Sequence, residues 1–210
     1  LEQQLGFNEL FFVTGGARFD AHSAFGEAAG FAFYPKVDAS YVVSSHDFFP
    51  QHLGTLRLRG AFGTAGQQPG VFDSEMTWEP VTALEAEPAL TTGKLGDPNL
   101  TAEVSRELEL GFDLGLFNER VSVGFTRYQQ RTHNALFGAR SPASEGFITP
   151  QLRNVGLVAN DGNELAVTAT VLDGRNLSWS LRGAFSTNRN EVRSLGGEAP
   201  LSVAWSQWIR

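Results

Sequence analysis

The stretch from Ser105 to Phe137, SRELELGFDLGLFNERVSVGFTRYQQRTHNALF, contains two runs in which apolar side chains alternate with polar or small ones. Successive side chains of a β-strand point to opposite faces, so a period of two assigns these residues to two surfaces. A helix would mix the two kinds of residue, since its period is 3.6. The stretch therefore predicts a hairpin that turns at residues 117–120. The first run places large apolar residues on one face: Leu108, Leu110, Phe112, Leu114 and Leu116.

The same alternation recurs along the 210-residue chain. GFAFYPKVDASYVVS, TLRLRGAFG and LSWSLRGAFS each oppose an apolar row to a polar one. Together these patterns predict an all-β fold, an antiparallel meander of long strands. We expect seven strands, at roughly 8–20, 29–45, 54–65, 104–117, 119–132, 163–173 and 176–190.

The connections between these strands differ in length. The two longest, about 66–103 and 133–162, fall on one side of a meander, whereas the tight turns near residues 118 and 174 fall on the other. Outer-membrane barrels have short periplasmic turns and long external loops. The run from Ser105 to Leu116 also extends about 40 Å, enough to cross an apolar slab at a tilt. These features favour a strand layer that spans a membrane, with Tyr41 and Trp179 near its short-turn interface.

Composition excludes several classes of protein. Cysteine is absent, which excludes disulfides, thiolate metal sites and cysteine nucleophiles. The net charge of −7 argues against nucleic acid as a partner. The sequence also lacks the HExxH, G-x-S-x-G and phosphate-loop patterns. We therefore predict no catalytic residue, no cofactor and no metal site, and do not expect an enzyme.

Residues 95–137 resemble a segment of TonB-dependent outer-membrane receptors of the SusC-like, RagA-like branch. The resemblance lies in LGDPNL before a strand, in ELGFDLG within it, and in the Arg127-Tyr128 and Thr132 that end the next strand. Four further elements follow the family's order and spacing: RFDAHSAFG at 18–26, YP at 34–35, LRLRGAFGTAG at 56–66, and NVG with NDGNEL at 154–165. This likeness covers most of the chain.

The resemblance implies part of a barrel that has 22 strands in the family. We expect residues 1–210 to be an internal piece of the later barrel, without the plug, the TonB-contacting segment or the final strand. The function implied is active nutrient uptake, of oligosaccharides or peptides, across the outer membrane of a Gram-negative-type bacterium. The implied partners are outer-membrane lipid, the TonB complex, a SusD-like surface lipoprotein and the nutrient ligand.

The two long external loops, 66–103 and 133–162, carry aromatic side chains that suit contact with a ligand or a partner. Aromatic rings in such loops stack on sugars or pack on proteins, and the alternative is that they only pack the loops together. The candidate contact residues are Phe72, Trp78, Phe137, Arg140 and Phe147.

The alternation of apolar and polar residues alone leaves a second interpretation open, a soluble carbohydrate-binding β-sandwich. In a sandwich the apolar row faces a second sheet, whereas in a barrel it faces lipid. A hydrolase inside a barrel would need converging Ser, His and Asp side chains, and the scattered histidines argue against it. A barrel wedge leaves two unpaired strand edges and an apolar surface. The barrel interpretation therefore predicts poor solubility when this chain is produced alone.

Overall fold

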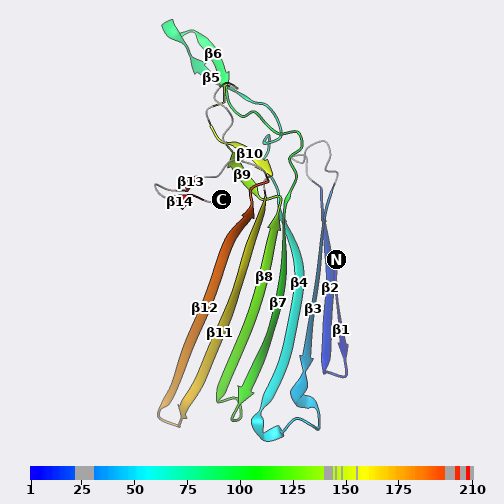
Figure 1. The fold of residues 1–210 in the computed structure, drawn as a ribbon. Coiled ribbons are helices and arrows are strands. Elements are labelled where there is room, and N and C mark those ends of the chain that lie inside the picture. Colours follow the sequence, from blue (N-terminus) through cyan, green and yellow to red (C-terminus); the bar gives the residue numbers. More distant parts are fainter. Residues whose placement is uncertain are drawn as a thin grey trace.

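The computed structural model describes residues 1–21, 31–139, 144, 146–147, 149–154, 156–196, 202–203 and 207–208. Within these residues the main element is an eight-stranded antiparallel sheet in the order β1-β2-β3-β4-β7-β8-β11-β12. Each strand pairs with the next long strand along the chain, so the sheet is the predicted meander (Figure 1). The other strands form three two-stranded ribbons, β5–β6, β9–β10 and β13–β14.

All the sheet strands except β1 have 10 to 17 residues, more than the usual five or six. Those of the sheet are β1 (Glu2–Phe7), β2 (Phe11–Asp20), β3 (Ala32–Val42), β4 (Thr55–Gln67), β7 (Glu103–Leu116), β8 (Val121–His133), β11 (Leu157–Asp173) and β12 (Ser178–Ser194). Those of the ribbons are β5 (Trp78–Thr82), β6 (Pro88–Thr92), β9 (Leu136–Ala139), β10 (Gln151–Asn154), β13 (Ser202–Val203) and β14 (Gln207–Trp208). The short 3₁₀ helices are η1 (Val43–Ser45), η2 (Gln51–Leu53) and η3 (Leu84–Ala86).

The predicted strands are confirmed with three corrections. The sequence reading missed β1, which pairs with β2 through a tight turn. It also placed residues 157–162 in a loop, whereas β11 begins at Leu157 and pairs with β8 from there onward. The two long connections are not structureless, because β5–β6 lies within the first and β9–β10 within the second.

Long and short connections lie at opposite ends of the sheet, as predicted (Figure 1). The tight turns accommodate left-handed backbone: Asn8 and Glu9 have φ of 52° and 56°, and Asn118 has φ of 57°. Consecutive positive φ angles in a short hairpin connection match the right-handed twist of the flanking strands. The β3–β4 connection at this end is longer and contains η1 and η2.

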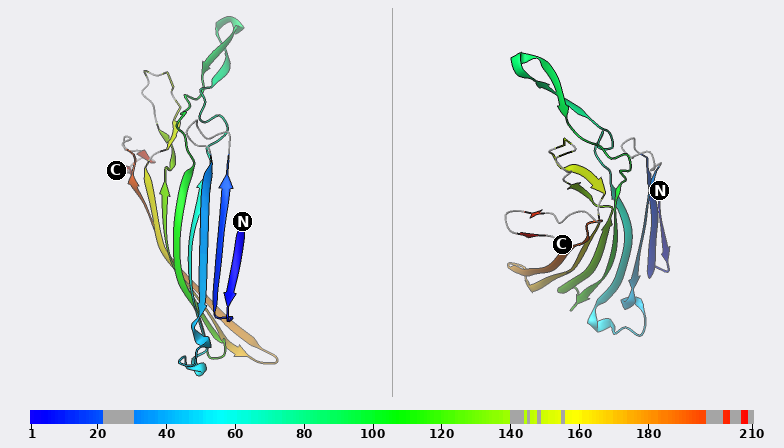
Figure 2. Two further views of the ribbon diagram at one scale, coloured as in Figure 1. Left: turned by 90° about the vertical axis from the view of Figure 1, so that its right-hand side faces the viewer. Right: turned by 45° about the horizontal axis from the view of Figure 1, so that its top comes forward.

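The sheet is one layer thick and curved (Figure 2). Its described residues have no second sheet or helix packed beneath them, so a β-sandwich is not what forms. The buried apolar residues gather instead at the loop end, where Leu100 is 0% exposed. The others are Tyr34, Ala102, Ala135, Ala139, Phe147, Ala159 and Leu195. Among the described residues, no helix combines the length and apolar composition needed to cross a membrane.

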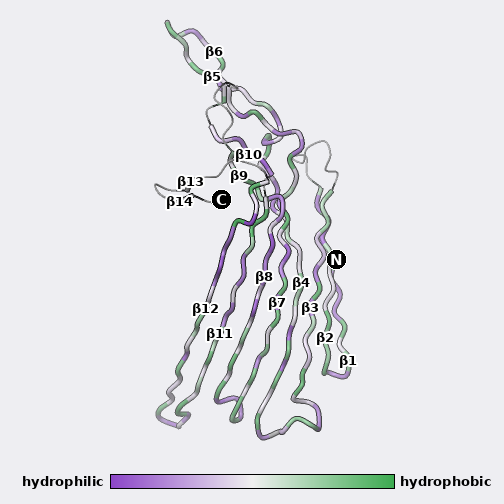
Figure 3. Tube along the Cα trace, in the orientation of Figure 1, coloured by the Kyte–Doolittle hydropathy of each residue, from purple (hydrophilic) through white to green (hydrophobic). Residues whose placement is uncertain are grey.

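Strand register divides the sheet into an apolar face and a polar face. Leu58, Phe112, Phe125, Leu165 and Phe185 face one another across five neighbouring strands. The residues next to them in sequence form rows of charged, hydroxyl or small side chains on the other face. Figure 3 shows this alternation as green and purple along each strand. The apolar face remains exposed: Leu110 is 57% and Phe185 63% accessible.

The apolar face forms a belt that runs obliquely to the strand register. On β12 its upper edge, toward the long loops, lies at Phe185. On β7 the upper edge is Leu108, four residues above the row of Phe185, and on β3 it is Phe33, eight residues above that row. Its lower edge shifts the same way, from Trp179 on β12 to Tyr41 on β3. With about 3.3 Å per residue and about 4.8 Å per strand, a shift of six to eight residues over five steps is a skew of about 45°. Strands of outer-membrane barrels tilt by about 35–45°. The belt therefore lies parallel to the membrane plane when the strands have this tilt.

Aromatic side chains mark the lower edge of the belt. Tyr41 and Trp179 lie at the short-turn ends of β3 and β12, as predicted. Phe48 and Phe117, in the connections beyond this edge, are 74% and 67% exposed. Aromatic rings are enriched where the hydrocarbon of a membrane meets water.

One glycine allows an aromatic ring to approach the backbone closely on the polar face. Tyr128 on β8 lies directly opposite Gly162 on β11. A Cβ atom at Gly162 would meet the Tyr128 ring and the Thr187 carbonyl oxygen, each at 2.4 Å. The Asn-Asp-Gly-Asn sequence around Gly162 suggests a turn, yet here glycine serves a close side-chain approach within a strand.

Val167 lies near the middle of the belt on β11, and the adjacent Ala166 points to the polar face. In the full-length protein we expect Val167→Arg to lower the free energy of unfolding by about 2–4 kcal/mol, because the arginine would face hydrocarbon. Ala166→Arg should change it by less than about 1 kcal/mol. Urea titration of the protein in phospholipid vesicles, read by heat-modifiable gel mobility, measures both. Equal losses in the two variants would show that the face assignment is wrong.

Gly162→Ala should destabilise the folded protein by about 1–3 kcal/mol, because the added methyl group overpacks Tyr128. Gly183→Ala is the matched control, since a Cβ atom there meets nothing within 4 Å. The same urea titration measures both variants. A destabilisation in Gly183→Ala as large as that in Gly162→Ala would contradict the packing argument.

Candidate functional site

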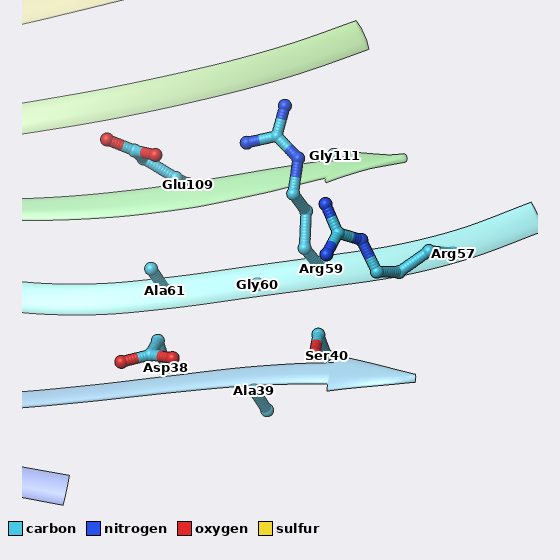
Figure 4. A pocket seen from close by; sticks show the side chains of 9 residues that line it. All are labelled: Asp38, Ala39, Ser40, Arg57, Arg59, Gly60, Ala61, Glu109 and Gly111. Carbon is cyan, nitrogen blue, oxygen red and sulfur yellow. The ribbon is translucent and has the colours of Figure 1, made fainter. Parts of the chain in front are cut away.

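The polar face carries charged side chains from three neighbouring strands. Alternation on β4 places Arg57 and Arg59 on this face, and alternation on β7 places Glu109 and Asp113 there. Asp38 joins them from β3, in the same row as Ala61 and Glu109. Figure 4 shows the arginines and both flanking acids projecting from these strands around a shallow hollow. We call these five residues the lumenal cluster: Asp38, Arg57, Arg59, Glu109 and Asp113.

Asp113 holds both arginines of the cluster. Arg57 donates to Asp113 Oδ2 from Nη2 at 2.7 Å and from Nε at 3.1 Å. The Nε atom of Arg59 lies 3.5 Å from the same oxygen, and its Nη2 donates to Thr126 Oγ1 at 2.6 Å. Because these groups are one third to one half exposed, each pair stabilises the fold by only about 0–1 kcal/mol. Their main effect is to fix the direction of the guanidinium groups.

Two acids of the cluster have no partner within the described part of the chain. Neither Asp38 nor Glu109 makes a hydrogen bond or an ion pair there, although the small side chain of Ala61 between them leaves both accessible. Glu107 accepts only a long hydrogen bond, 3.4 Å, from Gln130 Nε2. This part of the wall therefore offers carboxylates to a basic or hydrogen-bond-donating group placed against it.

The polar face has the chemistry of a contact surface. Among the residues that the structure describes, no three His, Cys, Asp or Glu side chains lie close enough to hold a metal ion. Its carboxylates and guanidinium groups belong to neighbouring strands and point the same way, so they can meet a complementary surface together. The register that brings Arg57 to Asp113 joins residues 56 apart in sequence, and no local signal predicts that pair.

Two candidate contact residues lie on the loop between β4 and β7. Phe72 is 64% exposed and has φ of 66°, and Trp78, the first residue of β5, is 56% exposed. The β5–β6 hairpin extends beyond the end of the sheet as an arm (Figure 1). Val81, Leu84 and Leu90 are also exposed on this arm.

The other three candidates differ in their surroundings. Phe137 lies on β9, opposite Arg153 of β10, and is half-buried. Phe147 is 6% exposed, which agrees with the alternative that these aromatics pack the loops together. Arg140 lies outside the described residues. Among the four candidates that the structure describes, Phe72 and Trp78 are exposed on the first loop, whereas Phe137 and Phe147 on the second are half-buried or buried.

The likeness to known proteins extends over the whole sheet. The family model described as TonB dependent receptor-like, beta-barrel, matches residues 1–205. TonB-dependent receptor P26 of Formosa agariphila is 30% identical over 199 residues, 91% of this chain and 20% of that protein. TonB-dependent receptor SusC of Bacteroides thetaiotaomicron is 23% identical over 192 residues, 86% of this chain and 19% of SusC.

Among solved structures, the RagAB peptide importer in its closed-closed state superposes with a TM-score of 0.86 at 23% identity, over 99% of this chain and 24% of that chain. The fold is therefore the same as in that barrel. The chain spans about a fifth of the length of the curated relatives it matches. In a barrel of this kind the polar face lines the lumen and the apolar belt faces lipid. The chain belongs to the TonB-dependent receptor-like β-barrel family of the outer membrane.

Proposed function

We propose that this chain is part of the barrel wall of a transporter that imports a nutrient of the oligosaccharide or peptide class. One observation carries the proposal: a single strand layer with a lipid-facing belt on one side and a charged, accessible face on the other. A wall of this kind encloses a polar passage, whereas an enzyme would need converging catalytic groups. The RagAB neighbour, a peptide importer, supports the peptide class.

The lumenal cluster is proposed as the seat of the plug, the domain that fills such barrels. Asp38 and Glu109 carry unpaired carboxylates, and Asp113 holds Arg57 and Arg59 in place for acceptors on the plug. Contacts to half-exposed charges are individually weak. A seat made of them would let the plug move when it is pulled. We propose that the TonB complex supplies this pull through a part of the receptor outside this chain.

A surface lipoprotein of the SusD-like kind is the proposed external partner. The β5–β6 arm supports this, because it reaches away from the barrel and exposes Trp78, Val81 and Leu90. Exposed aromatic anchors on a projecting hairpin suit a protein interface. Phe72 precedes the first residue of the arm by six positions and is also exposed. Phe137, Arg140 and Phe147 belong to the second loop and are proposed to shape the vestibule through which the nutrient enters.

Deletion of the gene for the full-length receptor tests the transport proposal. We expect the deletion strain to lose growth on one of two media, an oligosaccharide mixture with ammonium or a peptide digest, each supplied as the sole source of carbon and nitrogen. Growth on monosaccharides and amino acids should be unchanged.

Glu109→Gln combined with Asp38→Asn in the full-length receptor should lower uptake of that nutrient several-fold at normal receptor levels. Unchanged growth of the deletion strain on both sources would contradict transport of either class.

Removing the apolar side chains of the arm tests the partner proposal. In the full-length receptor we expect Trp78→Ala with Leu90→Ser to reduce co-purification of a lipoprotein by at least tenfold, since hot-spot aromatics each contribute about 2 kcal/mol or more. Leu177→Ser, which is equally exposed at the periplasmic end, is the control. Quantitative mass spectrometry of purified receptor measures the ratio. Equal ratios in both variants would exclude the arm as the contact.

A further inference from the structure

The outward face of β8, β11 and β12 changes character above the lipid-facing belt. Phe125, Leu165 and Phe185 form the last apolar row, and the next row is Arg127, Asn163 and Thr187. The next row is Gln129, Asp161 and Arg189, and the row above that has Arg131 and Glu191 on either side of the buried Ala159. We call this set the arginine patch: Arg127, Gln129, Arg131, Asp161, Asn163, Thr187, Arg189, Glu191 and Arg193. Figure 3 shows the upper part of β12 in purple above its mixed lower part.

The patch has an excess of positive charge. It contains four arginines and two acids, in a chain whose net charge is −7. Glu191 is shared by two of the guanidinium groups, because its Oε2 lies 3.4 Å from Arg189 Nη2 and 3.3 Å from Arg193 Nη2. Arg131 pairs with Asp161 at 3.1 Å. One carboxylate between two arginines leaves positive charge for an anion from outside.

Hydrogen bonds across the strands fix the patch. Arg127 donates from Nη1 to Asn163 Oδ1 at 3.1 Å, and Asn163 donates to Thr187 Oγ1 at 3.1 Å. These two hydrogen bonds orient the Arg127 guanidinium and leave its other N–H donors available to a ligand. The side chains surround an open depression of about 450 Å³, and Arg189 is 78% exposed at its rim. Guanidinium forks around a depression bind phosphate oxygens in pairs.

The position of the patch identifies its occupant. It is on the same face as the apolar belt and continues it toward the long external loops, at the level where the headgroups of the outer leaflet meet the barrel. A lipid whose chains lie along the belt places its headgroup against these side chains. We propose that the arginine patch binds the phosphate groups of an anionic outer-leaflet lipid. This site faces away from the lumen, so it is independent of which nutrient the receptor carries.

The test uses the full-length receptor, purified in a neutral detergent and mixed with bisphosphorylated lipid A or with the same lipid after removal of its phosphates. Native mass spectrometry counts the lipid bound per receptor. We expect the phosphorylated lipid to be retained at least tenfold more than the dephosphorylated one. Arg127→Gln, Arg189→Gln and Arg193→Gln together should lower its retention at least fivefold, and Arg189→Gln alone about twofold.

A triple variant with the same loss of charge is the control. Arg120, Arg175 and Arg182 lie in the periplasmic turns or on the lumenal face, so their replacement by Gln should leave retention within twofold of the unchanged receptor. Heat-modifiable gel mobility confirms that each variant is folded. Equal retention of the two lipids, or equal retention by the patch variant and the unchanged receptor, would overturn the proposal. So would loss of a receptor dimer in the patch variant with lipid retention unchanged, which would assign the surface to a second copy.

Discussion

The backbone hydrogen bonds between long neighbouring strands are the constraint on which the rest of this structure depends. A chain that crosses hydrocarbon has to satisfy every N–H and C=O group internally, and a meander does so through its neighbours. Each strand then presents its side chains alternately to two solvents. The belt of Leu58, Phe112, Phe125 and Phe185 and the lumenal cluster are two consequences of one ladder. Stability here comes from pairing and from lipid contact, while the buried apolar residues of the described part of the chain gather at the loop end.

The oblique course of the belt links sequence to orientation. Register is a property of the strands, whereas the height of the apolar segment is a property of the membrane. The apolar segments of all strands lie at one height only if the strands are tilted to the membrane normal. The offset between Trp179 on β12 and Tyr41 on β3 gives the size of this tilt. The same offset explains why Arg127 is the next residue after Phe125 on the outward face of β8, while the outward face of β3 remains apolar as far up as Phe33. A level membrane boundary crosses the strands at different residues.

Much of this fold was predictable because alternation, turn length and strand length are local signals. The hairpin at 105–137 and the sides on which loops and turns lie follow from them. The start of β11 could not be predicted, since Asn160-Asp161-Gly162-Asn163 has the composition of a turn and the glycine is explained by close contacts from the two neighbouring strands, with Tyr128 and Thr187. β1 was missed because EQQLGF is short and weakly alternating. The pairing of Arg57 with Asp113 and the arginine patch depend on register between distant strands, which parity within one strand does not determine.

The tilt also restricts how such a wall can change in length. One residue inserted between Val121 and Phe125 would turn the lower part of β8 inside out, since every side chain there would exchange faces. An insertion of two residues would return each side chain to its own face but displace the apolar segment of β8 by about 6.6 Å against its neighbours, as each residue rises about 3.3 Å. Neither change is confined to its own strand. We therefore expect insertions and deletions to accumulate beyond the end of the sheet, in segments such as the β5–β6 arm, which can change in length without altering the pairing of the sheet strands.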